Sequence, residues 1–508
     1  MSKIINLFDV KSKYQAINLI ILMTLASVLE LLGIGFVILV LNSFLGINDI
    51  YPSFIETLLN HFSPRENHES VHNILFLIFV IFTIKLLIVI FVSFKENSFH
   101  ANFREKITNK MYHNFLNRNV LSLLKKNSAI YLRNFTEELN LSMLFFVSLL
   151  KIILDFIILF AFLTFLLFFN ITITLSVFFI FTLIGIVYFY NIKDKLSIWA
   201  ISGLQNRKKR IQFINESFLA IKSIKILSQE NFFFKKLQQE NRIFRNISFK
   251  VNFLKSIPPN FFEYILLVSI LILFFYLIGQ NFSNEKIIQI LSVYALVSFR
   301  IVPIINRVIG NSQHLRYTYP SVKKLVTEID YKIIKKKSLI NKINFKKSIK
   351  LKFKHFSFSQ LKKPLFKNFS LEIKKNSKIG IIGPSGSGKS TIIDIICGFR
   401  NFENGIFKVD DKNVYNDIES WQKTIGYIPQ NIVIFNDTLR NNILFGSDSR
   451  KFSDKIINRL IDKVELNYLL KSSSKGLSQI ISQDGQNISG GEKQRIGIAR
   501  ALINNPEI

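Results

Sequence analysis

Six long apolar stretches dominate the first two thirds of the chain. A helix that crosses a lipid bilayer needs about 20 mostly apolar residues, and each stretch has roughly that length. They cover residues 17–41, 73–94, 142–168, 170–190, 258–280 and 287–308. Stretches of this length and number are typical of a membrane protein. The pattern therefore predicts six transmembrane α-helices, and because no small-residue cleavage site follows the first, we interpret it as a retained helix.

The pattern changes near residue 345. A Lys-rich segment is followed by short β-like runs, such as LKFKHFSFS (351–359) and SKIGIIG (377–383), which polar turns separate. Short apolar runs between turn residues are typical of a mixed α/β domain. We predict a six-helix transmembrane domain over 1–325, a basic linker over 326–350 and a soluble α/β domain over 351–508.

The charge of the chain is strongly positive and unevenly distributed. Lys and Arg number 66 against 34 Asp and Glu, a formal net charge of +32. The loops over 95–141 and 191–257 are rich in basic residues, whereas those over 42–72 and 279–286 are not. Positive loops stay on the cytoplasmic side, so we expect both termini and the α/β domain to be cytoplasmic. Attraction to anionic lipid explains the charge better than a nucleic-acid partner, which we do not expect.

Several charged residues fall inside the predicted spans. These residues are Glu30, Lys85, Lys151, Asp155, Glu263 and Arg300. A charge at bilayer depth is costly, so each is expected to face the helix bundle or water. One interpretation is mutual pairing, for example of Lys151 with Asp155 one helical turn away. The other is that Lys85, Lys151 or Arg300 binds an anionic head group of a substrate.

Shorter helices are expected between the spans. Apolar residues recur at helical spacing within 42–72, which predicts an amphipathic helix that either lies at the outer membrane interface or caps the bundle. Short helices near 115–127 and 213–228 would form the turns of two long cytoplasmic loops. Such turns would be natural contact points for a cytoplasmic domain.

A glycine-rich motif in the last third predicts a phosphate-binding loop. It comprises Gly383, Pro384, Ser385, Gly386, Ser387, Gly388, Lys389 and Ser390, followed by Thr391. The sequence fits G-x-x-x-x-G-K-[ST] and lies between an apolar run and a helix-like run. Backbone N–H groups of such a loop and the following helix N-terminus bind phosphates. Lys389 would bind the β- and γ-phosphates, and Ser390 would ligate Mg²⁺.

A second motif predicts another anion-binding helix start. Ser489 is followed three residues later by Glu492, which is the capping-box pattern of a helix N-terminus. Gly490 and Gly491 in the first turn leave the backbone N–H groups open to an anion. Taken alone, this segment is an ordinary capped helix; together with the phosphate loop it indicates a second phosphate contact.

These motifs make the chain similar to ABC (ATP-binding cassette) exporter half-transporters, in which six membrane helices precede one P-loop NTPase domain. Gly383–Ser390 resembles the Walker A motif, IGYIPQ with Gln430 resembles the Q-loop, and Ile488–Glu492 resembles the signature motif. The resemblance implies a dimer, expected to be a homodimer, in which two such domains enclose two ATP molecules. Ser489, Gly490 and Gly491 of one subunit would then meet the γ-phosphate held by the other subunit. Gln430 would contact Mg²⁺, and the loop turns would be coupling helices.

The sequence departs from the family pattern at several positions. The aromatic residue that usually stacks on adenine falls on Gln360, so Phe356 or Phe358 would have to substitute for it. Ile488 and Glu492 replace the usual Leu and Gln of the signature, and Gln483 replaces a Glu that often precedes it.

The segment that carries the Walker B Asp and the catalytic Glu in this family is not found in the 508 residues. We therefore expect a C-terminally truncated chain, without a nameable general base, that binds ATP and hydrolyses it poorly. The alternative is an ATP-binding membrane switch, or a degenerate half-transporter without hydrolysis of its own.

The membrane half resembles bacterial exporters that flip lipid-linked oligosaccharides, in the segments 25–38, 215–226 and 258–263. The resemblance implies a lipid-linked or amphipathic substrate, with export of a drug, a peptide or another lipid as the open alternatives. The abundance of Phe, Ile, Lys and Asn is typical of an AT-rich genome, which favours a bacterial inner membrane. One Cys excludes a disulfide scaffold; we interpret it, Cys397, as a core residue, and expect no metal beyond Mg²⁺.

Overall fold

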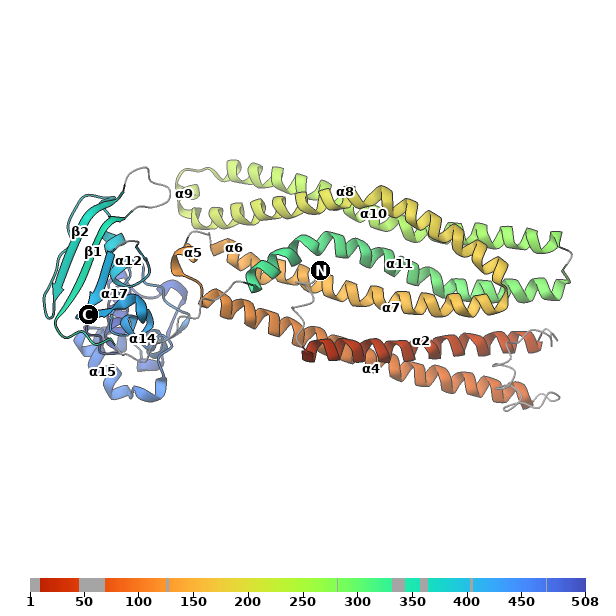
Figure 1. Cartoon of the computed structure of the whole chain (residues 1–508), viewed down its shortest axis with the longest axis horizontal. Helices are drawn as coiled ribbons and strands as arrows, with labels where there is room; N and C mark the ends of the chain where they lie inside the picture. The colour runs from red at the N-terminus through yellow and green to blue at the C-terminus, as the bar shows by residue number, and fades with distance from the viewer. Residues whose placement is uncertain are drawn as a thin grey trace. The chain divides into compact units, whose positions relative to one another are not determined.

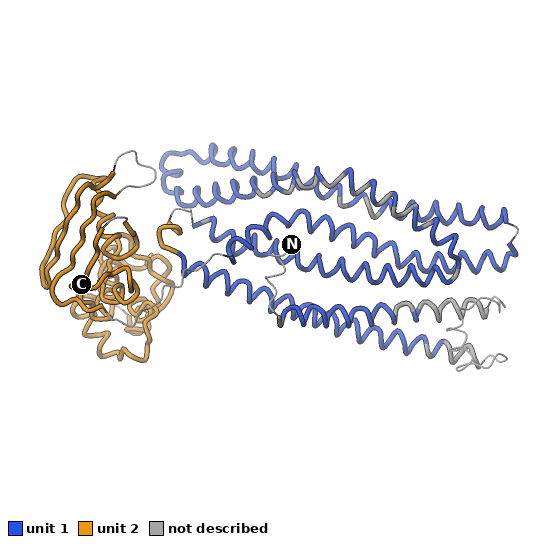
Figure 2. Tube along the Cα trace, in the orientation of Figure 1, with its two compact units in different colours: residues 1–118, 126–332 blue, residues 119–125, 333–508 orange. Residues whose placement is uncertain are grey.

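The structure is a computed structural model that divides into two compact units (Figure 2). It describes residues 10–44, 69–124, 128–280, 282–330, 343–356, 364–402, 405–471 and 473–508. Unit 1 comprises 1–118 and 126–332, and unit 2 comprises 119–125 and 333–508. Unit 1 is helical, whereas unit 2 is an α/β domain (Figure 1).

Long helices build unit 1. The described residues include α2 (Val10–Phe44), α4 (Glu69–Leu116), α7 (Leu139–Phe169), α8 (Ile171–Leu219), α10 (Glu230–Gly279) and α11 (Asn284–Ile329). Each of the six apolar stretches falls on a different one of these helices. α4, α8 and α10 continue far beyond the apolar stretch, as the pattern of the basic loops predicts.

Short helices connect the long ones. They are α5 (Val120–Leu124), α6 (Ser128–Arg133), the π-helix η1 (Asn134–Glu138) and α9 (Ile221–Ile226). α5 and α9 lie within the segments predicted to turn back toward the membrane. In the second segment, α8 continues to Leu219, so the separate helix is shorter than the pattern suggests. The amphipathic helix predicted within 42–72 falls almost entirely outside the described residues.

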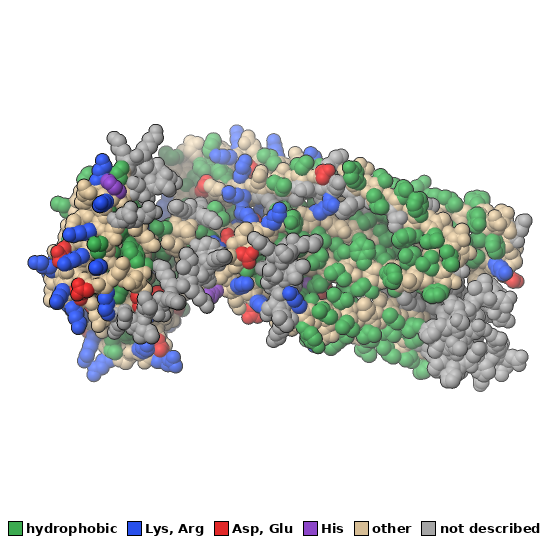
Figure 3. Space-filling view, in the orientation of Figure 1, with side chains coloured by type: hydrophobic (Ala, Val, Ile, Leu, Met, Phe, Trp, Pro, Cys, Tyr) green, Lys and Arg blue, Asp and Glu red, His purple; other side chains and the backbone are tan. Residues whose placement is uncertain are grey.

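The surface of unit 1 is apolar over much of its length. Phe79, Phe94, Phe168, Phe275 and Phe299 are all exposed. Figure 3 shows hydrophobic side chains over the right-hand part of this unit and Lys and Arg side chains toward its left-hand end. Among the residues searched, five helices are long and apolar enough to cross a membrane; α8 is the long helix that they do not include. An exposed apolar surface of this extent requires lipid.

Two apolar clusters hold the helices of unit 1 together. One cluster joins α7, α8, α10 and α11 through side chains such as Phe162, Leu277 and Val297. The other joins α4, α7 and α11 through side chains such as Ile107 and Val322. α7 and α11 take part in both clusters and are the central packing elements of the unit.

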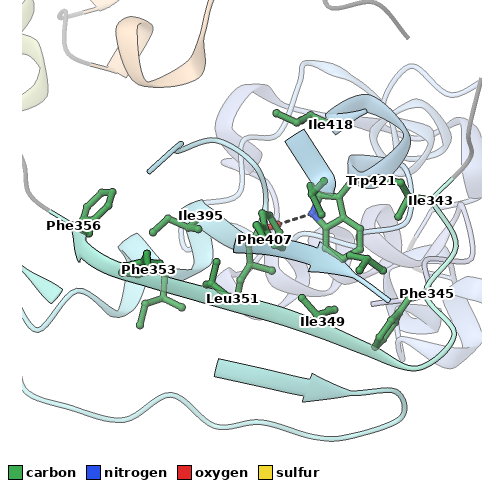
Figure 4. Close-up of a cluster of buried hydrophobic side chains, with 14 residues drawn as sticks. Ile343, Phe345, Ile349, Leu351, Phe353, Phe356, Ile395, Phe407, Ile418 and Trp421 are labelled. Atoms are coloured by element: carbon green, nitrogen blue, oxygen red, sulfur yellow. Dashed lines mark hydrogen bonds between the residues drawn. The ribbon is translucent and has the colours of Figure 1, made fainter. Parts of the chain in front are cut away.

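An antiparallel sheet forms one part of unit 2. Its strands are β1 (Ser348–Phe356), β2 (Phe366–Lys374), β3 (Gly405–Val409) and β4 (Lys412–Asn413), in the order β2-β1-β3-β4. Leu351 lies opposite Leu371 on one side and Phe407 on the other. Side chains of alternate β1 residues point into the core, where they meet α12 (Lys389–Ile396) and α13 (Ile418–Gln422) (Figure 4).

A second core of unit 2 is mostly helical. It contains α14 (Leu439–Leu444), α15 (Asp454–Lys463), α16 (Asn467–Lys471), α17 (Gly490–Leu502) and β6 (Ile480–Ile481). β6 pairs with β5 (Asp437–Thr438). Short 3₁₀ turns lie at Val414–Asn416, Ser449–Lys451, Gly476–Ser478 and Gln483–Gly485. The phosphate loop belongs to the first core, through α12. α17, the helix that follows the signature-like motif, belongs to the second core.

The prediction of a strand just before the phosphate loop is wrong for this structure. Residues 377–384 belong to no strand, and none of the described strands pairs with them. Ile382 is 95% exposed. A β-strand needs a hydrogen-bonded neighbour, so the apolar run stays irregular.

Candidate nucleotide site and charged residues of the membrane helices

The predicted phosphate loop is an exposed turn that leads directly into α12. Gly386 and Gly388 have φ values of 83° and 91°, in the left-handed region that favours glycine. Gly388 is the N-cap of α12, and a Cβ there would collide with the ring of Phe366. The motif needs glycine here both for backbone conformation and for packing.

Lys389 folds back over this loop. Its Nζ donates hydrogen bonds to the carbonyl oxygens of Gly383 and Pro384, at 2.8 Å each. Ser390 is exposed in the first turn of α12, whereas Thr391 is buried. Apart from Thr391, the loop therefore presents its polar groups at the surface, next to a helix N-terminus that favours anions.

The far end of α12 is fixed by its neighbours. Trp421 is completely buried, and its Nε1 donates to the carbonyl oxygen of Ile396 at 2.7 Å. Gln422 donates to the carbonyl oxygen of Cys397 at 3.0 Å. Cys397 is buried, as its interpretation as a core residue requires, and burial with Asp394 nearby raises its pKa to about 11. These contacts hold the helix rigidly behind the loop.

The capping box at the start of α17 is confirmed. The backbone N–H of Glu492 donates to Ser489 Oγ at 3.2 Å, and Glu492 Oε2 accepts from the Ser489 backbone N–H at 2.7 Å. The same carboxylate oxygen accepts from the Ser489 hydroxyl at 2.8 Å. Gly490 and Gly491 are exposed, with open space where a Cβ would lie.

The remaining predicted site residues have separate outcomes. Gln430 is exposed, in the irregular segment before α14. Phe356 is buried against Phe353 and Phe366, so the expectation that it could replace the adenine-stacking aromatic residue is wrong. Gln360 and Phe358 lie outside the described residues. Gln483 is exposed in a 3₁₀ turn.

Arg500 is an anchoring residue that sequence reasoning missed. From α17 it donates to the carbonyl and side-chain oxygens of Asn442, at 2.5 and 2.9 Å, and to the carbonyl oxygen of Val433 at 2.6 Å. Burial lowers its pKa, and Asn442 is completely buried. Arg500 thus ties the signature helix to the segment that follows Gln430. Its partners lie 58 and 67 residues away in sequence, so no local pattern indicates them.

The charged residues inside the membrane helices pair between helices. Asp155 on α7 is buried and accepts from Nε and Nη2 of Arg307 on α11, at 3.0 and 2.9 Å. Lys151 instead lies 3.8 Å from Glu96 on α4. The predicted pairing of Lys151 with Asp155 is therefore wrong, because the buried carboxylate faces α11. The sequence analysis did not single out Arg307 as a charged residue of the spans, because it lies at the end of the apolar stretch 287–308.

The other charged residues of the spans have less defined surroundings. Lys85 lies 5.6 Å from the ring centroid of Phe82, whereas Glu263 and Arg300 are exposed. The side chain of Glu30 lies outside the described residues.

The arrangement defines a membrane protein whose helical unit is joined to an α/β unit with a phosphate-binding loop. A family model of the ABC transporter transmembrane region matches residues 32–302, more than half of the chain, and an ABC transporter model matches residues 366–508. The chain belongs to the ABC transporter family, whose members are ATP-hydrolysing transporters.

Known proteins support this assignment. The chain is 40% identical over 160 residues to the mitochondrial iron-sulfur clusters transporter ATM1 of Debaryomyces hansenii, covering 31% of this chain and 23% of that protein. It is 38% identical over 160 residues to the corresponding protein of Candida albicans, covering 31% and 21%. These matches span about a fifth to a quarter of the relatives' length.

A solved structure shares the fold over nearly the whole chain. It is a bacterial Atm1-family ABC exporter with ATP bound, with a TM-score of 0.74, 17% sequence identity and coverage of 98% of this chain and 84% of that chain. The fold is therefore that of a type I ABC exporter half-transporter.

Proposed function

We propose that the loop Gly383–Thr391 binds the phosphates of ATP, with Lys389 on the β- and γ-phosphates and Ser390 as a Mg²⁺ ligand. The position of Lys389 carries this proposal. Its ammonium group contacts neutral carbonyl oxygens, and no described acidic side chain forms an ion pair with it. A cation without a counter-charge at a helix N-terminus suits an anionic ligand. Mg²⁺ bound with ATP would neutralise phosphate charge, and exposed Gln430 is its second proposed ligand.

The signature residues are proposed to complete the site of a second copy of the chain. Ser489, Gly490 and Gly491 are exposed at the start of α17, where backbone N–H groups favour an anion. In a homodimer they would contact the γ-phosphate held by the partner's phosphate loop. One ATP-binding half in each chain is consistent with a dimer of two such chains.

A cross-linking experiment tests this arrangement. Ser385→Cys and Gly491→Cys, combined in a Cys397→Ser background, are expected to form an intersubunit disulfide only when Mg-ATP is added. Each single cysteine variant is the control for non-specific dimerisation. A cross-link that is equally efficient without nucleotide, or none with it, would contradict the proposed sandwich.

The proposed activity is ATP-driven export of an anionic, amphipathic substrate, of the lipid-linked class that the sequence suggests. Two cations of the membrane helices support this. Lys151 and Arg307 are about half exposed, whereas their carboxylate partners Glu96 and Asp155 are largely buried. The paired cations can therefore still meet a phosphate or pyrophosphate group.

An iron-sulfur substrate is the second candidate, and it comes from the names of the relatives. The single Cys of the chain is buried in unit 2. Thiolate ligation of a cluster by the membrane helices is therefore not available. This observation favours the lipid-linked substrate.

Transport into inside-out membrane vesicles distinguishes the two candidates. ATP-dependent uptake of a lipid-linked oligosaccharide pyrophosphate, reduced in Arg307→Gln, is the expected result. Uptake of an iron-sulfur cluster complex, without uptake of the lipid-linked compound, would favour the second candidate. The same vesicles test the proposed bacterial inner-membrane location and the cytoplasmic position of unit 2, since ATP added outside them should drive transport.

The alternative function is an ATP-binding membrane switch, or a half-transporter without hydrolysis of its own. Steady-state release of phosphate from ATP by the purified protein would contradict this alternative.

A further inference from the structure

A cluster of polar side chains joins the C-terminal ends of α4 and α11. We call it the α4–α11 polar cluster; it comprises Asn114, Arg118, Asn134, Glu138, Lys324 and Glu328. All six residues belong to unit 1. The nucleotide and membrane charge sites described above use none of them.

Side chains at the end of α4 and just after it satisfy the last carbonyl groups of α11. Asn114 Nδ2 donates to the carbonyl oxygen of Ile329 at 2.7 Å, and Arg118 Nη2 donates to that of Glu328 at 3.1 Å. The last carbonyls of a helix lack intrahelical partners, and a cation near them is stabilising. Arg118 also forms an ion pair with the Glu328 carboxylate. The Arg118 side chain is only 7% exposed, so this pair is shielded from water.

The start of α7 is tied to the same end of α11. Glu138, at the end of the π-helix, accepts from Lys324 Nζ at 2.9 Å. Asn134 Nδ2 lies 3.4 Å from Glu328 Oε1. Both Asn134 and Glu138 are buried. A π-helix shifts the side chains that follow it around the helix axis and is frequent at functional sites. The cluster thus joins three helices.

The cluster lies at the places where the chain leaves unit 1. The boundary between the units falls after Arg118, between Lys125 and Lys126, and after Lys332. Arg118 is the last residue of unit 1 before α5, and Glu328 lies one helical turn before the exit of α11. The ends of α4 and α11, from which the chain leaves for unit 2, are therefore joined by a largely buried ion pair and by side chain–backbone hydrogen bonds.

We propose that the α4–α11 polar cluster holds these exits together, so that movement driven by ATP reaches α4, α7 and α11 as one body. Arg118 and Glu328 are its positioning residues. They keep the end of α4 and the end of α11 in fixed relation. Without the pair, unit 2 could move while the two helices separate, and nucleotide binding would no longer be transmitted. The inference rests on ATP-driven transport by this chain.

The test uses the full chain in lipid nanodiscs, with a spin label at Ile288→Cys, an exposed position near the other end of α11. Binding of a fluorescent ATP analogue is measured in parallel, which tests the proposed nucleotide site separately. In Glu328→Gln and Arg118→Met, we expect analogue affinity within about twofold of the parent. The change in the label spectrum on addition of Mg-ATP should fall to half or less.

Two further variants separate positioning from general destabilisation. The exchange Arg118→Glu with Glu328→Arg restores opposite charges and is expected to recover part of the label response. Glu372→Gln, which breaks the exposed Lys350–Glu372 pair of unit 2, is the matched control and should respond like the parent. An unchanged label response in Glu328→Gln would overturn the proposal. So would a loss of nucleotide affinity in that variant as large as its loss of response.

Discussion

Two sites of the molecule, one in each unit, hold their cations in opposite ways. In the membrane helices, Arg307 and Lys151 lie against carboxylates on neighbouring helices. In unit 2, Lys389 lies against carbonyl oxygens of its own loop. The first arrangement neutralises the charge within the protein, as a low-dielectric surrounding demands. The second leaves the charge for a ligand, so the same residue chemistry stabilises one unit and prepares the other for binding.

Removing the cation of the buried pair should have the largest effect. Arg307→Ala leaves the Asp155 carboxylate buried without a counter-charge, at an expected cost on the order of 3 kcal/mol of unfolding free energy. Asp155→Asn should cost only about 1 kcal/mol, because Arg307 is 51% exposed and can turn toward water. Unfolding of the detergent-solubilised protein with increasing denaturant measures both. Equal costs for the two variants would contradict the asymmetry.

Removing the unpaired cation of the loop should affect binding and leave stability unchanged. Lys389→Ala loses charge-assisted hydrogen bonds to the proposed phosphates, so Mg-ATP affinity should fall about tenfold to a hundredfold. The unfolding midpoint should stay near that of the parent, since only loop carbonyls lose a partner. Lys378→Ala, an exposed lysine of the preceding run, is the matched control. Titration calorimetry provides the affinities, and ATP affinity that survives in Lys389→Ala would remove this lysine from the site.

A smaller change would sharpen the description of the second anion-binding helix start. The Glu492 carboxylate accepts from the Ser489 hydroxyl, which is proposed to contact the γ-phosphate. Glu492→Gln keeps an acceptor for the capping box and removes the negative charge. Because a negative charge near the proposed γ-phosphate is lost, we expect Glu492→Gln to dimerise at an ATP concentration about twofold to fivefold lower than the parent protein.

The alanine variant at this position separates charge from helix capping. Glu492→Ala also removes the charge, but it loses the capping box and should destabilise the domain by about 1 kcal/mol. Dimerisation followed by light scattering distinguishes the variants. If Glu492→Gln needs as much nucleotide as the parent, the carboxylate does not compete with the phosphate.

The smallest effect concerns Cys397. Because its pKa is raised to about 11 from 9.0, the folded protein keeps the thiol neutral at pH 8, and maleimide labelling should be very slow. The unfolded chain loses this proton at lower pH. The contribution of the thiol to stability is therefore complete below pH 9 and declines between pH 9 and 11. Labelling at pH 8 with and without denaturant measures how well the folded protein protects this thiol. Rapid labelling of the folded protein would contradict the burial of Cys397.

The same contrast explains which features the sequence predicts. The phosphate loop and the capping box are formed by hydrogen bonds between residues three to six positions apart, so a local motif specifies them. The membrane stretches are equally visible, because lipid imposes length and hydropathy. The partners of Asp155, Glu328 and Arg500 lie 58 to 210 residues away, and only the packed helices bring them together. The irregular run before the phosphate loop was mispredicted because strand formation depends on a neighbour.

The Asp155–Arg307 pair also constrains how the protein is made. The two residues are 152 positions apart, and a ribosome adds about 5–20 residues per second. After Asp155 is added to the growing chain, about 8–30 s must therefore pass before Arg307 is added. During that interval α7 carries a carboxylate that lacks its Arg307 partner. Among the described residues α11 is the last long helix of unit 1, so the partner of a buried charge on α7 is supplied late in synthesis.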